Sequence, residues 1–182
     1  RFDPAINRVG LNNHTAQKPY IYSEVNKYYD FEEENRKLRF KKSSWFGRKW
    51  WNEHLVTIKG EGYWLTLDAG VDLQVGKDFG SNVNTETYNN TRLVYTQGGL
   101  GKDFSFFGVI YESQGRFADY FNRYAESIRP DGGNPAIIPA HGIAKEFKSG
   151  GYDYPLATGH ISYSPSKYFN LQFGHGKTFI GD

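Results

Sequence analysis

The sequence predicts an all-β protein, namely the first part of a transmembrane antiparallel β-barrel with long extracellular loops. The main observation is the stretch 62–76, in which every second residue from Tyr63 to Val75 is apolar or aromatic. The residues between them are small, polar or charged, apart from Trp64. Since successive side chains of a strand point to opposite faces, this strand has one apolar and one polar face.

The length of this stretch favours a membrane over a soluble sheet. At about 3.3 Å per residue the strand is roughly 50 Å long. A strand that crosses a bilayer needs about 9–11 residues, whereas ordinary soluble strands have about 5–6. We therefore expect the apolar side chains to contact lipid and the polar side chains to line the barrel interior.

The composition supports the same fold class. Aromatic residues make up 18% of the chain, which suits strands with aromatic belts better than a helical core. The net charge of +2 argues against a nucleic-acid partner. The chain contains no apolar run of about 18 residues, so no transmembrane helix is predicted. The chain has no Met and starts at Arg1 without a signal-peptide pattern, so we expect a leader that is either removed or not included in this sequence. The sequence stops directly after a predicted strand, so we expect further strands after Asp182.

Two regions are expected along the chain. Residues 1–52 form a polar N-terminal segment with a possible short helix at 23–38, and residues 53–182 form the first barrel strands. The N-terminal segment is expected to be a solvated segment or a plug packed on the sheet. The alternative is a basic patch for anionic lipid headgroups or an acidic glycan.

Three tryptophans of this region are candidate contact residues. Trp45, Trp50 and Trp51 surround the basic residues Arg48 and Lys49. An indole ring beside a cation suits a membrane interface, where the ring is half buried and its N–H stays hydrated. Such a ring also suits stacking on a sugar, so these residues are candidates for interface anchoring or glycan stacking.

Alternation and turn signals predict six strands, which are 53–59, 63–76, 92–100, 104–112, 156–163 and 169–176. Residues 60–62 are either a turn or a bulge within one long strand. Short links alternate with long ones at 78–90 and 113–155, and the latter contains a helix-like pattern at 116–129. Outer-membrane barrels show this asymmetry, with tight periplasmic turns and long outer loops. Six strands are too few for such barrels, so further strands are required.

The turn at 101–103 sets a register between its two flanking strands. It places Thr96 opposite Gly108, and Arg92 opposite Glu112 as an ion pair worth about 0.2–1 kcal/mol. The apolar face of this pair then carries Leu93, Tyr95, Val109 and Tyr111.

The link 164–168 sets a second register. It places Ile161 opposite Leu171 and Tyr163 opposite Phe169, so that one face is wholly apolar and the other polar or Gly.

The polar positions of these strands give the candidate interior residues, which are Asp68, Asp72, Gln74, Arg92, Glu112, His160 and Gln172. No catalytic, metal or cofactor site is expected among them. Asp68 and Asp72 lie roughly 13 Å apart along a strand, too far for a glycosidase pair. The sequence around Lys177 resembles a phosphate-binding loop but lacks its first Gly. An enzyme is therefore not expected.

The block ISYSPSKYFNLQFGHGKTFIGD, residues 161–182, resembles outer-membrane proteins of Bacteroidota related to capsule assembly Wzi, and especially the gliding-motility RemB-type members. The segment 44–76, with WFGRKWWNEHL and the long strand, is also similar to that family. The resemblance implies a many-stranded barrel in the bacterial outer membrane with long outward loops. The first 50 residues depart from the family pattern, since no multi-helix periplasmic bundle is evident.

Three functions follow as hypotheses. The first is an outer-membrane surface protein for gliding motility, adhesion or capsular polysaccharide attachment, with lipid, polysaccharide or other outer-membrane and secretion proteins as partners. The second is a barrel subunit of an outer-membrane transport or secretion complex. The third is a soluble β-sandwich binding module, which needs a second sheet over Leu65, Leu67, Val71 and Leu73.

Overall fold

The structure is a computed structural model that describes residues 2–11, 17–80, 86–133, 135–148, 150–166 and 168–181. The chain divides into two compact units. Unit 1 consists of Arg1–Asp68, Thr96–Gly108 and Thr158–Asp182, and unit 2 consists of Ala69–Tyr95 and Val109–Ala157.

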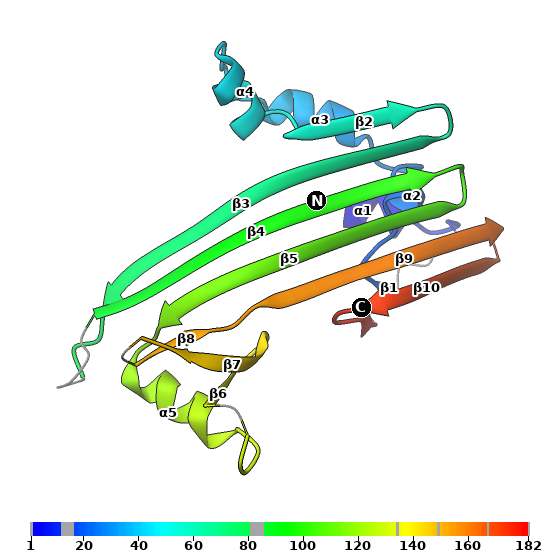
Figure 1. Cartoon of the computed structure of the whole chain (residues 1–182). Helices are drawn as coiled ribbons and strands as arrows, with labels where there is room; N and C mark the ends of the chain where they lie inside the picture. Colours follow the sequence, from blue (N-terminus) through cyan, green and yellow to red (C-terminus); the bar gives the residue numbers. More distant parts are fainter. Residues whose placement is uncertain are drawn as a thin grey trace. The chain divides into compact units, whose positions relative to one another are not determined.

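The fold is mostly antiparallel β-sheet, as predicted, and within the described residues nine strands form one open sheet. All six predicted strands are present in it (Figure 1), as β2 (Val56–Gly60), β3 (Tyr63–Lys77), β4 (Glu86–Leu100), β5 (Phe104–Arg116), β9 (Leu156–Ser166) and β10 (Phe169–His175). These strands neighbour one another in that order. β5 also pairs with β8 (Gly151–Asp153), which continues through β7 (Gly142–Phe147) to β6 (Ala136–Ile138).

Residues 60–62 form a hairpin turn rather than a bulge. β2 pairs with β3 from Val56 opposite Leu67 to Gly60 opposite Tyr63. The turn closes at Gly62, whose φ of 78° lies in the left-handed region that only Gly adopts without strain.

The short turns of unit 1 lie at the same end of the strands. Gly101 N in the β4–β5 turn donates a hydrogen bond of 2.6 Å to Gly62 O in the β2–β3 turn. Ser164 N, near the end of β9, donates a bond of 2.8 Å to Asp103 O. The short links that the sequence predicts are therefore neighbours in space.

The strand predicted at 92–100 is too short, since β4 already begins at Glu86. Part of the predicted loop 78–90 is thus strand, while residues 81–85 lie outside the described residues. Polar residues at this end have partners elsewhere in unit 2, which hydrophobic alternation does not reveal. Asn89 Oδ1, for example, accepts a hydrogen bond from the Tyr154 hydroxyl.

The predicted register of β9 and β10 is wrong by two residues. Ile161 pairs with Phe173 and Tyr163 pairs with Leu171, and the register shifts between Phe169 and Leu171. β9 extends to Ser166, which makes the link shorter than predicted; Lys167 within it lies outside the described residues. Because a shift of two keeps every side chain on its face, the separation into an apolar and a polar face still holds.

The odd-numbered side chains of β3, here called the apolar face, are solvent-exposed along much of the strand. In unit 2, Val71, Leu73 and Val75 are 55%, 69% and 92% exposed. Exposed apolar residues of the other long strands and β2 include Val94 and Ile110 in unit 2 and, in unit 1, Val56, Ile58, Leu100, Phe104, Ile161, Leu171 and Phe173. Within each unit, no second sheet of described residues covers these side chains.

The N-terminal segment folds into short helices rather than the one predicted helix at 23–38. They are α1 (Asp3–Ile6), α2 (Tyr22–Val25), α3 (Phe31–Leu38) and α4 (Trp45–Trp51). Asp30 caps α3 by accepting a hydrogen bond of 2.8 Å from Glu33 N, and Ser44 caps α4 in the same way at 3.1 Å from Gly47 N. No helix in the described part of the chain is both long and apolar enough to cross a membrane.

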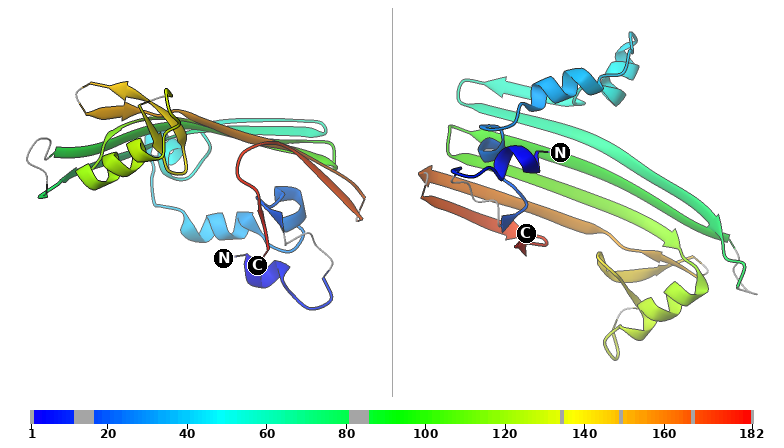
Figure 2. Two further views of the ribbon diagram at one scale, coloured as in Figure 1. Left: turned by 90° about the horizontal axis from the view of Figure 1, so that it is seen from below. Right: turned by 180° about the vertical axis from the view of Figure 1, so that it is seen from behind.

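The N-terminal segment lies on one side of the strands of unit 1, where Figure 2 shows α1 to α3. The side is the polar face, since the rings of Tyr22 on α2 and Trp64 on β3 are 5.5 Å apart. β1 (Gln17–Lys18) pairs with β11 (Phe179–Ile180) after the last long strand. The segment therefore contacts the sheet of unit 1 at α2.

The predicted helix within 116–129 is present as α5 (Asp119–Ser127) in unit 2. It packs with the small strands β6 to β8 around a buried cluster, namely Ala125, Ala136, Ile138, Ala144, Tyr152 and Tyr154, with Phe117 and Phe121 beside it. The long connection is thus a folded element rather than a loop.

Candidate functional site

The polar face of β3, formed by its even-numbered residues, carries carboxylates that already have partners. Asp68 Oδ2 lies 2.6 Å from His54 Nδ1, and Asp68 Oδ1 accepts a hydrogen bond of 3.0 Å from Leu55 N. Asp72 Oδ2 accepts a bond of 2.9 Å from Gln74 Nε2. Asp68 therefore ties the residues before β2 to β3, and Asp72 and Gln74 form a polar pair further along the strand.

Arg92 lies on the opposite face from Asp72, contrary to the expectation that they line one surface. A Cβ atom on Gly70 would lie 3.3 Å from the Leu93 side chain, so Leu93 shares the polar face and its neighbour Arg92 does not. Arg92 NH2 donates a hydrogen bond of 3.3 Å to Gln114 Oε1. Odd-numbered residues of β4 therefore share a face with even-numbered residues of β3. The sequence between the two strands does not predict this offset.

Glu112 lies on the same face as Arg92, but the expected ion pair between them is not formed among the described residues. Thr91 Oγ1 and Ser113 Oγ are 3.0 Å apart, which agrees with the predicted register of β4 and β5. The odd residues of β5 therefore share the polar face, and Glu112 belongs to the other one. The predicted register is right, whereas the assignment of Leu93, Tyr95, Val109 and Tyr111 to the apolar face is wrong.

His160 and Gln172 lie on the polar side of unit 1. The His160 ring is buried with its centroid 5.2 Å from that of Phe107, and its Nδ1 atom has no hydrogen-bond partner among the described residues. Gln172 Nε2 donates a bond of 3.3 Å to Ser162 Oγ on the neighbouring strand. Both side chains therefore contact a residue of a neighbouring strand, Phe107 of β5 for His160 and Ser162 of β9 for Gln172.

A cavity of about 890 Å³ lies between the N-terminal helices and the strands of unit 1. Tyr22 forms part of its wall, stacked on Phe31 at 5.2 Å, and burial together with the nearby Glu32 carboxylate raises the pKa of Tyr22. Thr66 Oγ1 is 4% exposed, lines the cavity and has no partner among the described residues. Aromatic rings, side-chain amides and charged side chains of both signs line the cavity. Such a lining suits a polar ligand that also has apolar faces.

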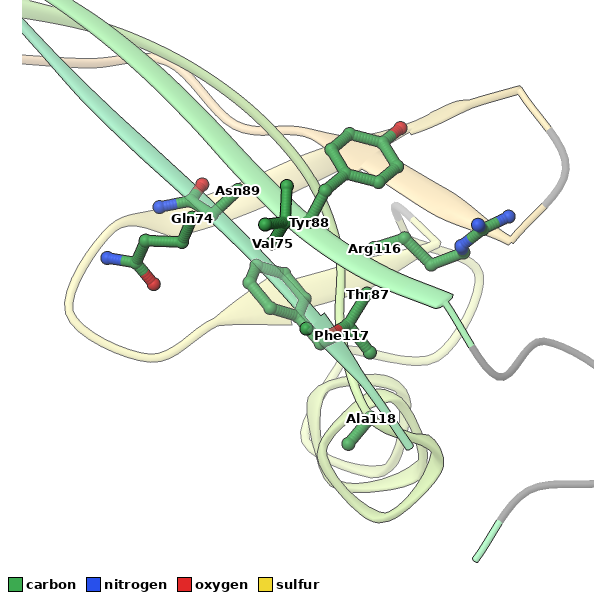
Figure 3. A pocket seen from close by; sticks show the side chains of 9 residues that line it. Gln74, Val75, Thr87, Tyr88, Asn89, Arg116, Phe117 and Ala118 are labelled. Carbon is green, nitrogen blue, oxygen red and sulfur yellow. The ribbon is translucent and has the colours of Figure 1, made fainter. Parts of the chain in front are cut away.

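A smaller pocket of about 170 Å³ lies in unit 2, where β3, β4 and the end of β5 meet (Figure 3). Arg116 Nε donates a hydrogen bond of 2.7 Å to Glu86 O, and the Arg116 guanidinium lies 5.7 Å from the centre of the Tyr88 ring. Gln74 is the one predicted interior residue that lines this pocket. Its volume holds a few water molecules or one small polar group.

No sequence pattern indicates the other residues of this region. Tyr154 and Asn89 are hydrogen-bonded across 65 positions. Burial, with the Asp72 carboxylate nearby, raises the pKa of Tyr154 to about 12. Neither residue lies in a motif, so only tertiary structure brings them together.

Trp45, Trp50 and Trp51 all lie on α4 and are exposed. The Phe46 and Trp50 rings stack at 5.8 Å, and the Phe40 and Trp51 rings are 5.3 Å apart. None of the three tryptophans is among the described residues that line the cavity of unit 1. They form a surface of their own.

No group of three or more His, Cys, Asp or Glu side chains is placed to hold a metal ion among the residues that the structure describes. The His54–Asp68 contact joins one imidazole and one carboxylate, and no nucleophile among the described residues is bonded to the pair. No protein-family model, curated protein or solved structure matches this chain.

Proposed function

We propose that this chain forms the first strands of a bacterial outer-membrane β-barrel, a surface protein that acts in gliding motility, adhesion or capsular polysaccharide attachment. The observation that carries the proposal is the exposed apolar face, with Val71, Leu73 and Val75 in unit 2. Apolar side chains of other strands, such as Phe173 of β10 in unit 1, are exposed as well. Large exposed apolar surfaces mark membrane or protein contacts. Removing such surface from water contributes about 25 cal/mol per Å².

The connections between strands support a defined orientation. Three short turns meet at one end of unit 1, while 78–85 and 117–155 form the longer connections. In outer-membrane barrels, short turns face the periplasm and long connections face outward. The element with α5 and β6 to β8 would then be the part presented at the cell surface.

An open sheet cannot remain open in lipid, because unpaired backbone N–H and C=O groups cost several kcal/mol each there. Insertion therefore requires other strands to pair with the free edges, which are β2 and the part of β3 beyond Leu67 on one side and β10 on the other. The polar face becomes the interior, and the part of the N-terminal segment around α2 packs against it there.

The transport or secretion alternative has one observation in its favour, the cavity of about 890 Å³ beside the polar face of unit 1. A soluble β-sandwich has none, because no second sheet of described residues covers the apolar face within either unit. Channel conductance in planar bilayers separates the transport role from a surface role, since a surface protein with a filled interior conducts no ions.

Surface labelling tests the proposal. The chain has no Cys, so single variants can report exposure on living cells of the source bacterium. Asp131→Cys in the long connection should react with a membrane-impermeant maleimide on intact cells. Lys102→Cys in a short turn is the matched exposed control and should react only after the outer membrane is permeabilised. Equal labelling of both on intact cells, or of neither after permeabilisation, contradicts the proposal.

Deletion of the gene separates the three surface roles. Loss of gliding with an intact capsule supports motility, release of capsular polysaccharide into the medium supports attachment, and reduced surface binding alone supports adhesion. Wild-type behaviour in all three assays contradicts the surface roles together.

A further inference from the structure

Residues 36–51, here called the basic–aromatic segment, combine positive charge and large apolar side chains without a single acidic residue. Their sequence RKLRFKKSSWFGRKWW holds seven Lys or Arg residues, five aromatic residues and Leu38. The segment runs from the end of α3 through α4. The packing of unit 1, to which the segment belongs, does not explain why so many basic and aromatic residues occur together here.

The apolar side chains of the segment are not used to build unit 1. Leu38, Phe40, Trp45, Phe46, Trp50 and Trp51 are all between 45% and 66% exposed. Gly47 is the one buried residue of α4. A helix that packed on its own domain would bury an apolar stripe, whereas α4 leaves its rings on the surface.

The cations of the segment are only partly neutralised. Lys37 pairs with Glu33 at 2.7 Å, while Arg48 and Lys49 share Glu53 at 3.3 and 3.5 Å. Among the described residues, no carboxylate pairs with the remaining four, which are Arg36, Arg39, Lys41 and Lys42. The exposed rings are thus surrounded by free positive charge.

We infer that residues 36–51 bind the surface of an anionic lipid bilayer. Aromatic rings settle at the boundary between headgroups and acyl chains, and Lys and Arg side chains near the surface are attracted to anionic headgroups. The basic–aromatic segment supplies both groups at once. The inference concerns the N-terminal segment and does not depend on whether the sheet crosses a membrane.

A lipid surface fits this segment better than a sugar. Saccharide and other small-ligand sites are concave, with polar groups converging on the ligand. The rings of α4 instead stand on an exposed helix, and two of them are already paired with Phe46 and Phe40. A flat, charged interface requires no concave site.

Tryptophan fluorescence tests this binding directly, because the chain has four Trp residues and three belong to the segment. The variant Trp64→Phe leaves these three as the only reporters. The full chain is mixed with, or reconstituted into, vesicles of brominated phosphatidylcholine with or without brominated phosphatidylglycerol. We expect strong quenching when phosphatidylglycerol is present and clearly weaker quenching without it.

Three triple variants separate the segment from the rest of the chain. The triple change of Trp45, Trp50 and Trp51 to Phe leaves Trp64 as reporter, and its fluorescence should not be quenched. The triple change of Arg39, Lys41 and Lys42 to Gln should weaken binding to phosphatidylglycerol vesicles roughly five-fold per charge. The same loss of charge outside the segment, at Lys102, Lys145 and Lys148, should change binding much less.

Three outcomes overturn the inference. The first is the absence of quenching in phosphatidylglycerol vesicles, and the second is equal weakening by the two charge variants. The third is a fluorescence change with soluble polygalacturonate but none with vesicles, which assigns the segment to an anionic glycan. None of these outcomes bears on the strands, so the barrel proposal stands or falls separately.

Discussion

At the scale of single residues, Tyr154 links the long connection to the polar face of unit 2. Its side chain is 2% exposed, its N–H donates a 2.9 Å hydrogen bond to Ser113 O, and its hydroxyl donates to Asn89 Oδ1. Burial and the Asp72 carboxylate raise its pKa to about 12. The folded protein thus favours the neutral hydroxyl.

This pKa predicts a specific loss of stability at high pH. Because the folded pKa is raised, the contribution of Tyr154 is complete below about pH 10 and is lost as the pH rises through about 12. Tyr154→Phe should cost about 1–3 kcal/mol at neutral pH by leaving Asn89 unpaired. The difference in unfolding free energy from wild type should then shrink above about pH 10. Urea titrations monitored by Trp fluorescence measure it.

The exposed Tyr120→Phe serves as the control, with no expected effect at any pH, since Tyr120 is 72% exposed. A difference between Tyr154→Phe and wild type that stays constant across the alkaline range contradicts the proposed role of the buried hydroxyl.

The sheet face of a side chain can be predicted from the sequence when it depends on the alternation within one strand. It cannot be predicted when it depends on how two strands are paired. The polar positions Asp68, Asp72 and Gln74 follow from the alternation of β3 alone. The positions of Arg92 and Glu112 depend on how β4 is set against β3, and the sequence pattern between those strands does not predict this offset. Strand alternation therefore identified the two faces of each hairpin, but not which of them continues the polar face of β3.

At the scale of elements, the long strands are predictable because the alternation of apolar and polar residues lies within each strand. The helices of the N-terminal segment are predictable only in part. α4 contains Gly47 and four aromatic residues, none of which favours a helix strongly. Its start depends on the Ser44 cap. The small strands β6 to β8 were not predicted, since their burial comes from α5, which packs on them across the connection.

The β9–β10 register gives a prediction at this scale. The structure pairs Ile161 with Phe173, and Leu171 is then a diagonal neighbour with Cβ atoms roughly 7–8 Å apart. In a chain without Cys, the double variant Ile161→Cys/Phe173→Cys should form a disulfide under mild oxidation. Ile161→Cys/Leu171→Cys should not, because disulfides need Cβ atoms about 3.5–4.5 Å apart. Gel mobility with and without reductant distinguishes them.

Preferential cross-linking of the Ile161–Leu171 pair would restore the register expected from the turn length and contradict the shift by two residues. Cross-linking of both pairs at equal rates would indicate a slipping hairpin, which also contradicts a single register.

At the scale of the whole molecule, the apolar face must contact lipid rather than water or a second layer of protein. The fold class follows from one strand pattern, and the open sheet with exposed Val, Leu, Ile and Phe side chains in each unit is consistent with it. The same exposure in water would be a liability for aggregation, since long apolar sheet surfaces and free edges pair with other chains. A bilayer removes that liability only if the sheet closes.

The most direct test is a nitroxide scan of β3 in the reconstituted protein. Single Cys variants at each position from Ala69 to Val75 carry a spin label, and collision with oxygen, which dissolves in lipid, is compared with collision with a water-soluble nickel chelate. We expect oxygen contact to dominate at 69, 71, 73 and 75 and nickel contact to dominate at 70, 72 and 74. Nickel contact at the odd positions, or no contact with either reagent there, would show that water or protein covers this face and would contradict the account.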